Sequence, residues 1–201
     1  MRQRVLVAMS GGVDSSVAAW MAKEQGFDPV GLFMRTGVSQ PQGGHSDRKK
    51  GCCSASDAAD ARRVADMLDI PFHAIDFEAD FRGIIDYFAD EYLSGRTPNP
   101  CIMCNERVKF GNLRDKAASL GASFIATGHY AKVRKEQGRF VISKGEDSWK
   151  DQSYVLWGVT QECLSRTIFP VGSYHKTEIR DMAARMGLRS RLLGGHSTHG
   201  I

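Results

Sequence analysis

Apolar and polar positions along the chain follow two different periods in turn, which predicts alternating strands and helices. Four segments have the apolar or alternating character of strands: Val5–Met9, Val30–Met34, Phe72–Phe77 and Ser123–Thr127. The segments between them repeat apolar residues at helical spacing: 15–25, 54–68, 80–93 and 107–120. Strands that alternate with helices in this way predict an α/β fold, a parallel sheet with helices on both faces.

The pattern changes after residue 130. Residues 131–133 and 139–142 flank Gly138 and predict a short hairpin. Helical character then returns in three short segments, which predict a small helical extension of the sheet: 151–159, 161–166 and 176–186. The last residues show no periodicity. We therefore divide the chain into three parts: 1–145, the α/β unit; 146–188, the helical continuation; and 189–201, an aberrant tail.

The chain has 201 residues, which is enough for one α/β domain and little more. No apolar run approaches the length of a membrane span, and the N-terminal apolar stretch is too short for a signal peptide. We therefore expect a cytoplasmic protein without a membrane partner, whose five cysteines are reactive thiols rather than structural disulfides. The net charge of +4 permits an anionic partner such as a nucleic acid without requiring one.

The junction of the first strand and the first helix carries the motif Ser10-Gly11-Gly12-Val13-Asp14-Ser15-Ser16. Glycines let backbone amides approach a ligand closely, and a helix N-terminus adds unpaired N–H groups, so this junction predicts a phosphate-binding loop. It lacks the Lys-Ser/Thr pair of the P-loop and the third glycine of the dinucleotide fingerprint. The SGGxDS pattern resembles the PP-loop of the N-type ATP pyrophosphatases. The alternative is a glycine turn with an incidental serine cap.

A second constellation, Arg96-Thr97-Pro98-Asn99-Pro100-Cys101-Ile102-Met103-Cys104-Asn105, holds a Cys-x-x-Cys pair behind two prolines. We place Cys104 just before a helix, where the helix dipole favours a nucleophilic thiolate. Such a cysteine suits sulfur transfer or covalent catalysis. Half of a zinc site, a redox pair and two buried small residues are the alternatives, although no second pair stands at zinc-finger spacing.

Together these motifs and several others resemble the tRNA-specific 2-thiouridylase family. The segments that carry the resemblance occur in family order: SGGVDSS, GLFM, RTPNPxxxCNxxxKFG, ATGHYA, KDQSY and IFPVG. They extend from Arg4 to about Leu188, which is nearly the whole chain. The resemblance implies an enzyme that adenylates the 2-carbonyl oxygen of the wobble uridine of tRNA and then transfers sulfur from a cysteine persulfide.

The resemblance also implies the residues of the site. ATP is expected on the PP-loop, with Mg²⁺ beside the pyrophosphate, through Ala8, Met9, Ser10, Gly11, Gly12, Val13, Asp14, Ser15, Met34 and Gly128. Cys104 falls on the family's nucleophile, and the partners are tRNA and a sulfur-donor protein. The expected tRNA contacts are Asn99, Pro100, Cys101, His129, Lys150, Asp151 and Gln152. From the residues alone, a solvated turn at 150–152 and a backbone-satisfied histidine at 129 are the alternatives.

The sequence departs from the family's pattern at two places. Cys101 stands where many members carry aspartate, which predicts a partner thiol for Cys104 or, with a third cysteine, the ligands of an iron–sulfur cluster. Residues 189–201 contain no cysteine, whereas the family continues to a second catalytic cysteine and two further domains. We therefore expect a truncated form that binds ATP but thiolates weakly or not at all. The alternative functions are another PP-loop adenylating enzyme and a remnant that binds nucleotide or tRNA without turnover.

Overall fold

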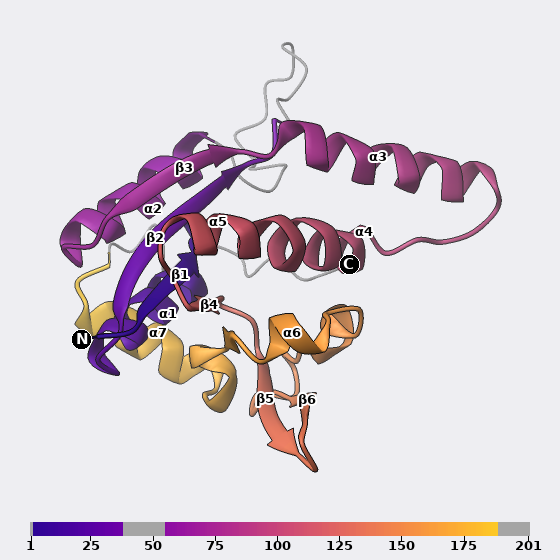
Figure 1. Cartoon of the computed structure of the whole chain (residues 1–201). Coiled ribbons are helices and arrows are strands. Elements are labelled where there is room, and N and C mark those ends of the chain that lie inside the picture. The colour runs from indigo at the N-terminus through magenta and orange to yellow at the C-terminus, as the bar shows by residue number, and fades with distance from the viewer. Residues whose placement is uncertain (1, 38–54, 189–201) are drawn as a thin grey trace.

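A parallel sheet forms the centre of the protein. The computed structural model describes residues 2–37 and 55–188, and within them the sheet has five strands in the order β3-β2-β1-β4-β7 (Figure 1). Its strands are β1 (Arg4–Ala8), β2 (Asp28–Arg35), β3 (Phe72–Asp76), β4 (Phe124–Ala126) and β7 (Thr167–Ile168). Every neighbouring pair runs parallel, so the carboxyl ends of the strands lie along one edge, where ligands of such sheets bind.

Helices connect the strands and continue beyond them. The main α-helices are α1 (Val13–Glu24), α2 (Ala55–Met67), α3 (Glu78–Leu93), α5 (Leu113–Ser119) and α7 (Lys176–Arg185). The other helical segments are α4 (Pro100–Met103), the π-helical η1 (Cys104–Asn112), η2 (Ser153–Leu156), α6 (Gln161–Leu164) and η3 (Pro170–Ser173). Among the described residues, no helix combines the length and the apolar character that crossing a membrane requires.

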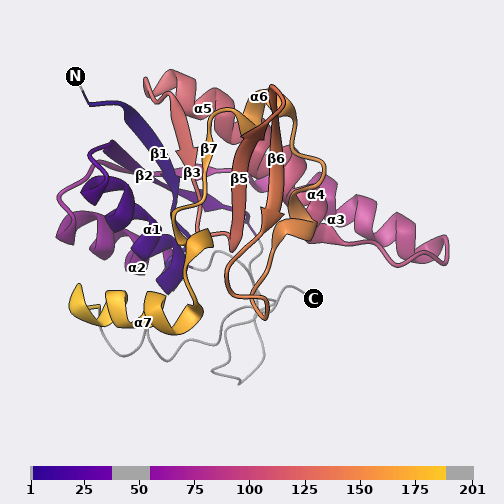
Figure 2. The same ribbon diagram turned by 90° about the horizontal axis from the view of Figure 1, so that it is seen from below.

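The side chains of β1 alternate between two buried clusters, one on each face of the sheet. Val5 and Val7 belong to a cluster that α1, α2 and α7 cover. Leu6 belongs to the opposite cluster, which α3, η1 and α5 cover. Figure 2 shows α1, α2 and α7 on one side of the sheet and α3 and α5 on the other. These two layers confirm the predicted α/β fold with helices on both faces.

A hairpin of β5 (Ala131–Glu136) and β6 (Arg139–Lys144) projects from the sheet (Figure 1). The predicted hairpin is thereby confirmed, although both strands extend farther than the sequence pattern indicates. Gly138 adopts a φ of +82° at its tip, a conformation that glycine tolerates without strain. A third buried cluster joins the hairpin to η1, η2 and α6, and Phe110 and Phe169 belong to it. This cluster fastens the hairpin to the body of the molecule.

The segment that follows the hairpin differs from the sequence prediction in two ways. The helix predicted at 151–159 is reduced to the 3₁₀ turn η2, because the Asp151 carboxylate accepts the backbone N–H groups of Gly145 and Ser153 and competes with helix formation. Strand β7 was not predicted, since two residues are too few to show a period. The part of the chain at 146–188 therefore contributes a strand to the central sheet. The predicted tail at 189–201 lies outside the described residues.

Candidate functional site

The PP-loop motif forms the turn between the carboxyl end of β1 and the first turn of α1. Gly11 has a φ of +78°, and a Cβ atom built on it would lie 2.3 Å from the Asp57 carbonyl oxygen of α2, so only glycine fits there. Gly12 is the N-cap of α1 and has no side chain to accept a hydrogen bond from the first turn. The N–H groups of that turn therefore lack a capping side chain and suit an anionic ligand.

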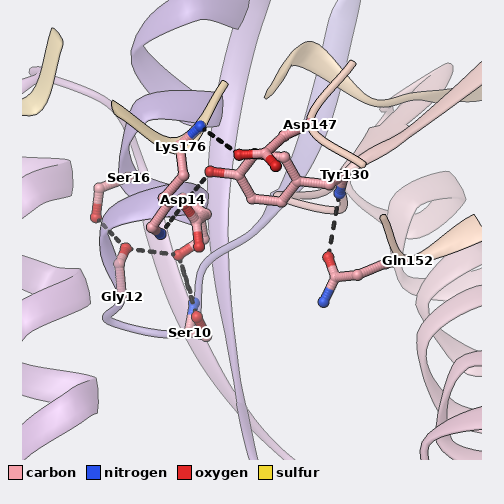
Figure 3. A network of polar contacts seen from close by, with 9 residues as sticks. Ser10, Gly12, Asp14, Ser16, Tyr130, Asp147, Gln152 and Lys176 are labelled. Atoms are coloured by element: carbon pink, nitrogen blue, oxygen red, sulfur yellow. Dashed lines mark hydrogen bonds and ion pairs between the residues drawn. The ribbon is translucent and has the colours of Figure 1, made fainter. Parts of the chain in front are cut away.

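Serine hydroxyls brace this turn from within. The Ser15 hydroxyl accepts the backbone N–H of Ser10 at 3.1 Å and donates to the Gly12 carbonyl at 3.1 Å. The Ser16 hydroxyl donates to the same carbonyl at 2.8 Å (Figure 3). Met9 and Val13 are buried in the core, so these two positions can offer a ligand only their backbone. The shape of the PP-loop is thus determined by hydrogen bonds within the protein itself.

Of the other residues expected to contact ATP, Gly128 lies directly against the loop. It follows β4, and a Cβ atom on it would approach the backbone of Asp14 and Ser15 to 2.8 Å, which explains the glycine. Met34 lies near the end of β2 and packs, together with Ala8, against the cluster around Leu6. The structure therefore gathers these predicted residues at the ends of β1, β2 and β4.

Two residues that the sequence analysis did not select converge on Asp14 in the PP-loop. The Tyr130 hydroxyl donates to Asp14 Oδ1 at 2.8 Å, and Lys176 Nζ lies 2.5 Å from the same oxygen (Figure 3). Burial, and then the charge of Asp14, raise the pKa of Tyr130, so its phenol stays protonated as a donor. Lys176 begins α7 and comes from the far end of the chain. Its only sequence signal is its place at the start of a predicted helix.

The turn at 147–152 holds both of these residues in place. The Asp147 carboxylate accepts the backbone N–H of Lys176 at 2.9 Å, and that bond is the main cause of its lowered pKa. Gln152 donates its backbone N–H to the Tyr130 carbonyl at 2.9 Å and accepts the Tyr130 N–H at 3.1 Å through its side chain. The Asp151 carboxylate accepts hydrogen bonds from Gly145 and Ser153, the residues that flank the turn. Of the tRNA contacts expected here, Asp151 and Gln152 thus use their side chains to bind the protein itself.

The cysteine pair lies one turn apart on a continuous helical segment. Pro100 occupies the first turn of α4, and the Asn99 side chain caps that helix by accepting the Cys101 N–H at 3.0 Å. Cys104 begins η1, in the second turn of the segment, so its predicted place just before a helix is wrong. A proline pre-set for helical φ starts the helix earlier than the pattern indicates. The dipole of the helix N-terminus therefore acts more strongly on Cys101 than on Cys104.

Both cysteines are partly exposed, and the segment that carries them bridges two of the buried clusters. Met103 and Cys104 pack against the cluster around Leu6 that Ala8 and Met34 also contact. Cys101 packs against the cluster of the hairpin. The predicted nucleophile and the start of the PP-loop thus contact the same buried cluster.

His129, an expected tRNA contact, is only 7% exposed. Its ring lies 6.3 Å from that of Phe110 and 6.0 Å from that of Phe169, and Nδ1 is 2.7 Å from the Thr127 hydroxyl. Burial, and then the charge of Lys109, hold the pKa of His129 well below its usual value of 6.5. The imidazole is therefore neutral at neutral pH and is placed to support the loop after β4.

The structure offers different ligands to the two metal groups that the sequence predicts, Mg²⁺ and an iron–sulfur cluster. Asp14 offers the carboxylate oxygen that Mg²⁺ prefers, directly in the PP-loop. For an iron–sulfur cluster, Cys101 and Cys104 supply two thiolates. Cys163 is buried and donates its thiol to the Phe110 carbonyl at 3.1 Å. Within residues 2–37 and 55–188, no group of three or more His, Cys, Asp or Glu side chains is arranged to hold a metal ion.

Comparison with known sequences gives one consistent result. The chain matches the family described as "tRNA methyl transferase HUP domain" over residues 3–193. It is 50% identical over 190 residues to the tRNA-specific 2-thiouridylase MnmA 2 of Clostridium tetani, covering 94% of this chain and 52% of that protein. It is 50% identical over 188 residues to the tRNA-specific 2-thiouridylase MnmA of Clostridium perfringens, covering 93% and 52%. The chain thus spans about half the length of these curated relatives.

Solved structures share the fold at much lower sequence identity. A 4-thiouridine synthetase in complex with RNA and bound ATP has a TM-score of 0.64 and 18% identity, covering 96% of this chain and 43% of that one. The NMN synthetase of Francisella tularensis has a TM-score of 0.58 and 16% identity, covering 99% and 67%. Because the family match spans nearly the whole chain and the curated relatives share half of its aligned residues, the chain belongs to the tRNA methyl transferase HUP domain family, that of the tRNA-specific 2-thiouridylases.

Proposed function

We propose that this protein catalyses the ATP-dependent 2-thiolation of the wobble uridine of tRNA. The proposal rests on one observation: Ala8, at the start of the PP-loop, and Cys104, on its helix, pack against the same buried cluster. An adenylating loop and a cysteine that contact one cluster could act in sequence on one carbonyl group of a substrate. The names of the 50% identical relatives support the same substrate and reaction.

In the first step, the 2-carbonyl oxygen of the uridine attacks the α-phosphorus of ATP, and the bond to pyrophosphate breaks. Backbone N–H groups of residues 8–15, including those at the N-terminus of α1, would bind the phosphates. Gly128 and Met34 would lie beside them. Bound Mg²⁺, held with the help of Asp14, would neutralise charge on the pyrophosphate. This step converts the carbonyl oxygen into AMP, a good leaving group.

In the second step, the terminal sulfur of a persulfide on Cys104 attacks C2 of the uridine, and AMP leaves with the oxygen. The thiolate of Cys101 then attacks the sulfur of Cys104, which releases the 2-thiouridine and leaves a Cys101–Cys104 disulfide. Cys101 and Cys104 are three residues apart on one helical segment, a spacing at which side chains on a helix can meet. A sulfur-donor protein supplies the persulfide, and a thiol reductant restores the pair.

For the RNA itself, we propose the surface around the capped helix and the turn after the hairpin. Asn99, Pro100 and Cys101 begin the helix that leads to Cys104, which suits a contact with the target base. Lys150 lies on the turn at 147–152 and is placed to meet a phosphate, the usual source of affinity for nucleic acids. Because His129 is buried, we propose that it stabilises the loop after β4 and does not contact RNA itself.

The test follows each half of the reaction with the purified chain, tRNA, ATP, Mg²⁺ and a persulfide donor. We expect pyrophosphate release that depends on tRNA. We also expect 2-thiouridine in the digested RNA, because Cys101 would act as the second thiol, and this result would overturn the weak thiolation expected from residues 189–201. Cys104→Ser should keep ATP binding and pyrophosphate release but lose the 2-thiouridine, whereas Cys163→Ser, at the buried cysteine, should keep both.

Three results would contradict the proposal in distinguishable ways. Pyrophosphate release without any need for tRNA would favour an adenylating enzyme for a small molecule. Nucleotide or tRNA binding without pyrophosphate release would indicate a non-catalytic protein. Undiminished thiolation by Cys104→Ser would remove the assigned nucleophile.

A further inference from the structure

We propose that RNA bound at the turn 147–152 controls the arrangement of the ATP loop, with Asp147 and Gln152 as the positioning residues that connect the two sites. This inference rests on the proposed function and adds a regulation to it. The turn has an inner face, which binds the residues that hold Asp14, and an outer face, which is exposed to solvent.

On the inner face, Gln152 fixes the backbone of Tyr130 from both sides. Its N–H donates to the Tyr130 carbonyl at 2.9 Å, and its side-chain oxygen accepts the Tyr130 N–H at 3.1 Å (Figure 3). The hydroxyl of the same tyrosine donates to Asp14 at 2.8 Å. A displacement of Gln152 therefore moves a direct hydrogen-bond donor of the ATP loop.

Asp147 fixes the second partner of Asp14 in a similar way. One oxygen of its carboxylate accepts the backbone N–H of Lys176 at 2.9 Å, and the ammonium group of that lysine lies 2.5 Å from Asp14 (Figure 3). Asp147 is only 8% exposed, so water competes little for these bonds. Two side chains of one short turn thus hold both groups that converge on the PP-loop carboxylate.

The outer face of the turn presents an aromatic ring to solvent. Trp149 is 93% exposed, and its backbone N–H binds the other oxygen of Asp147 at 3.1 Å. An exposed tryptophan offers a face on which an unpaired base can stack, whichever base it is. Because the Asp147 carboxylate connects the backbone of Trp149 to that of Lys176, a base that orders the turn also favours one position of Lys176 beside the ATP loop.

This arrangement predicts reciprocal coupling between the two ligands. RNA that orders the turn should tighten ATP binding, and ATP should tighten RNA binding by the same factor, since linkage requires it. We expect a factor of about tenfold, within the range that such couplings span. Because RNA-bound protein would bind ATP more tightly, the arrangement would favour ATP cleavage on protein that already holds RNA.

The experiment measures the affinity of the full chain for tRNA with and without α,β-methylene-ATP and Mg²⁺, an analogue that cannot be cleaved between its α and β phosphates. In the wild type, the analogue should strengthen tRNA binding about tenfold. Gln152→Ala should lose the coupling, so the analogue should no longer strengthen its tRNA binding relative to the same variant without the analogue. Tyr130→Phe, which removes only the hydroxyl that reaches Asp14, should lose it as well.

Gln161 provides a matched control. Like that of Gln152, its side chain binds the backbone of a residue on the hairpin side of the chain, accepting the Phe140 N–H at 2.9 Å, and it also donates to the Phe140 carbonyl at 2.7 Å, but Phe140 lies on β6. Gln161→Ala should therefore keep the full coupling. Trp149→Ala should weaken tRNA binding while ATP binding without RNA stays unchanged.

The possible failures can be told apart. Coupling that persists in both Gln152→Ala and Tyr130→Phe, or an equal loss in Gln161→Ala, would overturn the inference. Tight tRNA binding and thiolation with no effect of the analogue would overturn it and leave the proposed function standing. A wild-type chain that binds no tRNA would instead overturn the proposed function.

Discussion

Gly11 shows how a single residue can be required both for the shape of a loop and for its packing. Its φ of +78° disfavours any side chain, and a Cβ atom would collide with the Asp57 carbonyl at 2.3 Å. We expect Gly11→Ala to lower the free energy of unfolding by about 2 kcal/mol or more and to abolish ATP binding. Urea denaturation and nucleotide titration measure the two effects.

Gly26 offers the matched control, because it has a φ of +87° but open space around the Cβ position. Gly26→Ala should cost about 1 kcal/mol from the backbone conformation alone and leave ATP binding intact. Equal effects of the two substitutions on ATP binding would show that the contact with α2 is irrelevant to the loop.

His129 predicts a pH dependence of stability. Its pKa in the folded state lies below the ordinary value of 6.5, because burial disfavours the charged imidazole. The unfolded state therefore binds a proton first, so the stabilisation is complete above pH 6.5 and is lost as the pH falls toward the lowered folded pKa. We expect the free energy of unfolding, measured by urea denaturation, to fall below about pH 6.5 by up to about 1.4 kcal/mol per pH unit.

The substitution His129→Asn removes this titration while keeping a polar group near Thr127. It should flatten the pH dependence in that range, even if the variant is less stable at every pH. His73→Asn, the same substitution at an exposed histidine, provides the matched control. An unchanged slope in His129→Asn would place the titrating group elsewhere.

At the scale of secondary-structure elements, the cap of α4 decides where the cysteine helix begins. Asn99 is the N-cap, and its side chain accepts the Cys101 N–H. We expect Asn99→Ala to cost about 1 kcal/mol in urea denaturation, and Asn99→Ser, which can still cap, to cost much less. If Asn99 also contacts RNA, as we propose, both variants will bind tRNA more weakly. Unchanged tRNA affinity in Asn99→Ser would limit the residue to capping.

The elements also show what a sequence can reveal and why the rest stays hidden. The strand β1 and the PP-loop could be predicted, because an apolar run and a glycine pair act through their nearest neighbours. The turn η2 could not, since side-chain bonds of Asp151 displaced the expected helix. Lys176 and Asp14 are 162 positions apart, so no local pattern records their contact. The sequence therefore predicts the motifs of the candidate site but not Tyr130 and Lys176, which hold the PP-loop carboxylate, or Asp147, which holds that lysine.

At the scale of the whole molecule, the boundary that the sequence places between residues 145 and 146 crosses the core. Strand β7 pairs with β4, and α7 packs on the same cluster as α1. Val171, Ile179 and Ala183 are fully buried there. A buried side chain such as Val or Ile contributes about 1.5–3 kcal/mol, whereas a whole domain is stable by only about 5–15 kcal/mol. Losing this segment would remove much of that margin.

We therefore expect residues 1–145 alone to show no cooperative unfolding transition. In the full chain, tryptophan fluorescence and far-UV circular dichroism should give one coincident transition in urea, as a two-state unit requires. Far-UV circular dichroism follows the backbone of all helices, whereas fluorescence follows the tryptophans, among them Trp20 in α1 and Trp157 after η2, so the fluorescence covers both parts of the chain. A folded 1–145 fragment, or two separate transitions, would mean that 146–188 is an independent unit. Its contacts with Asp14 would then have to form by docking after each part has folded.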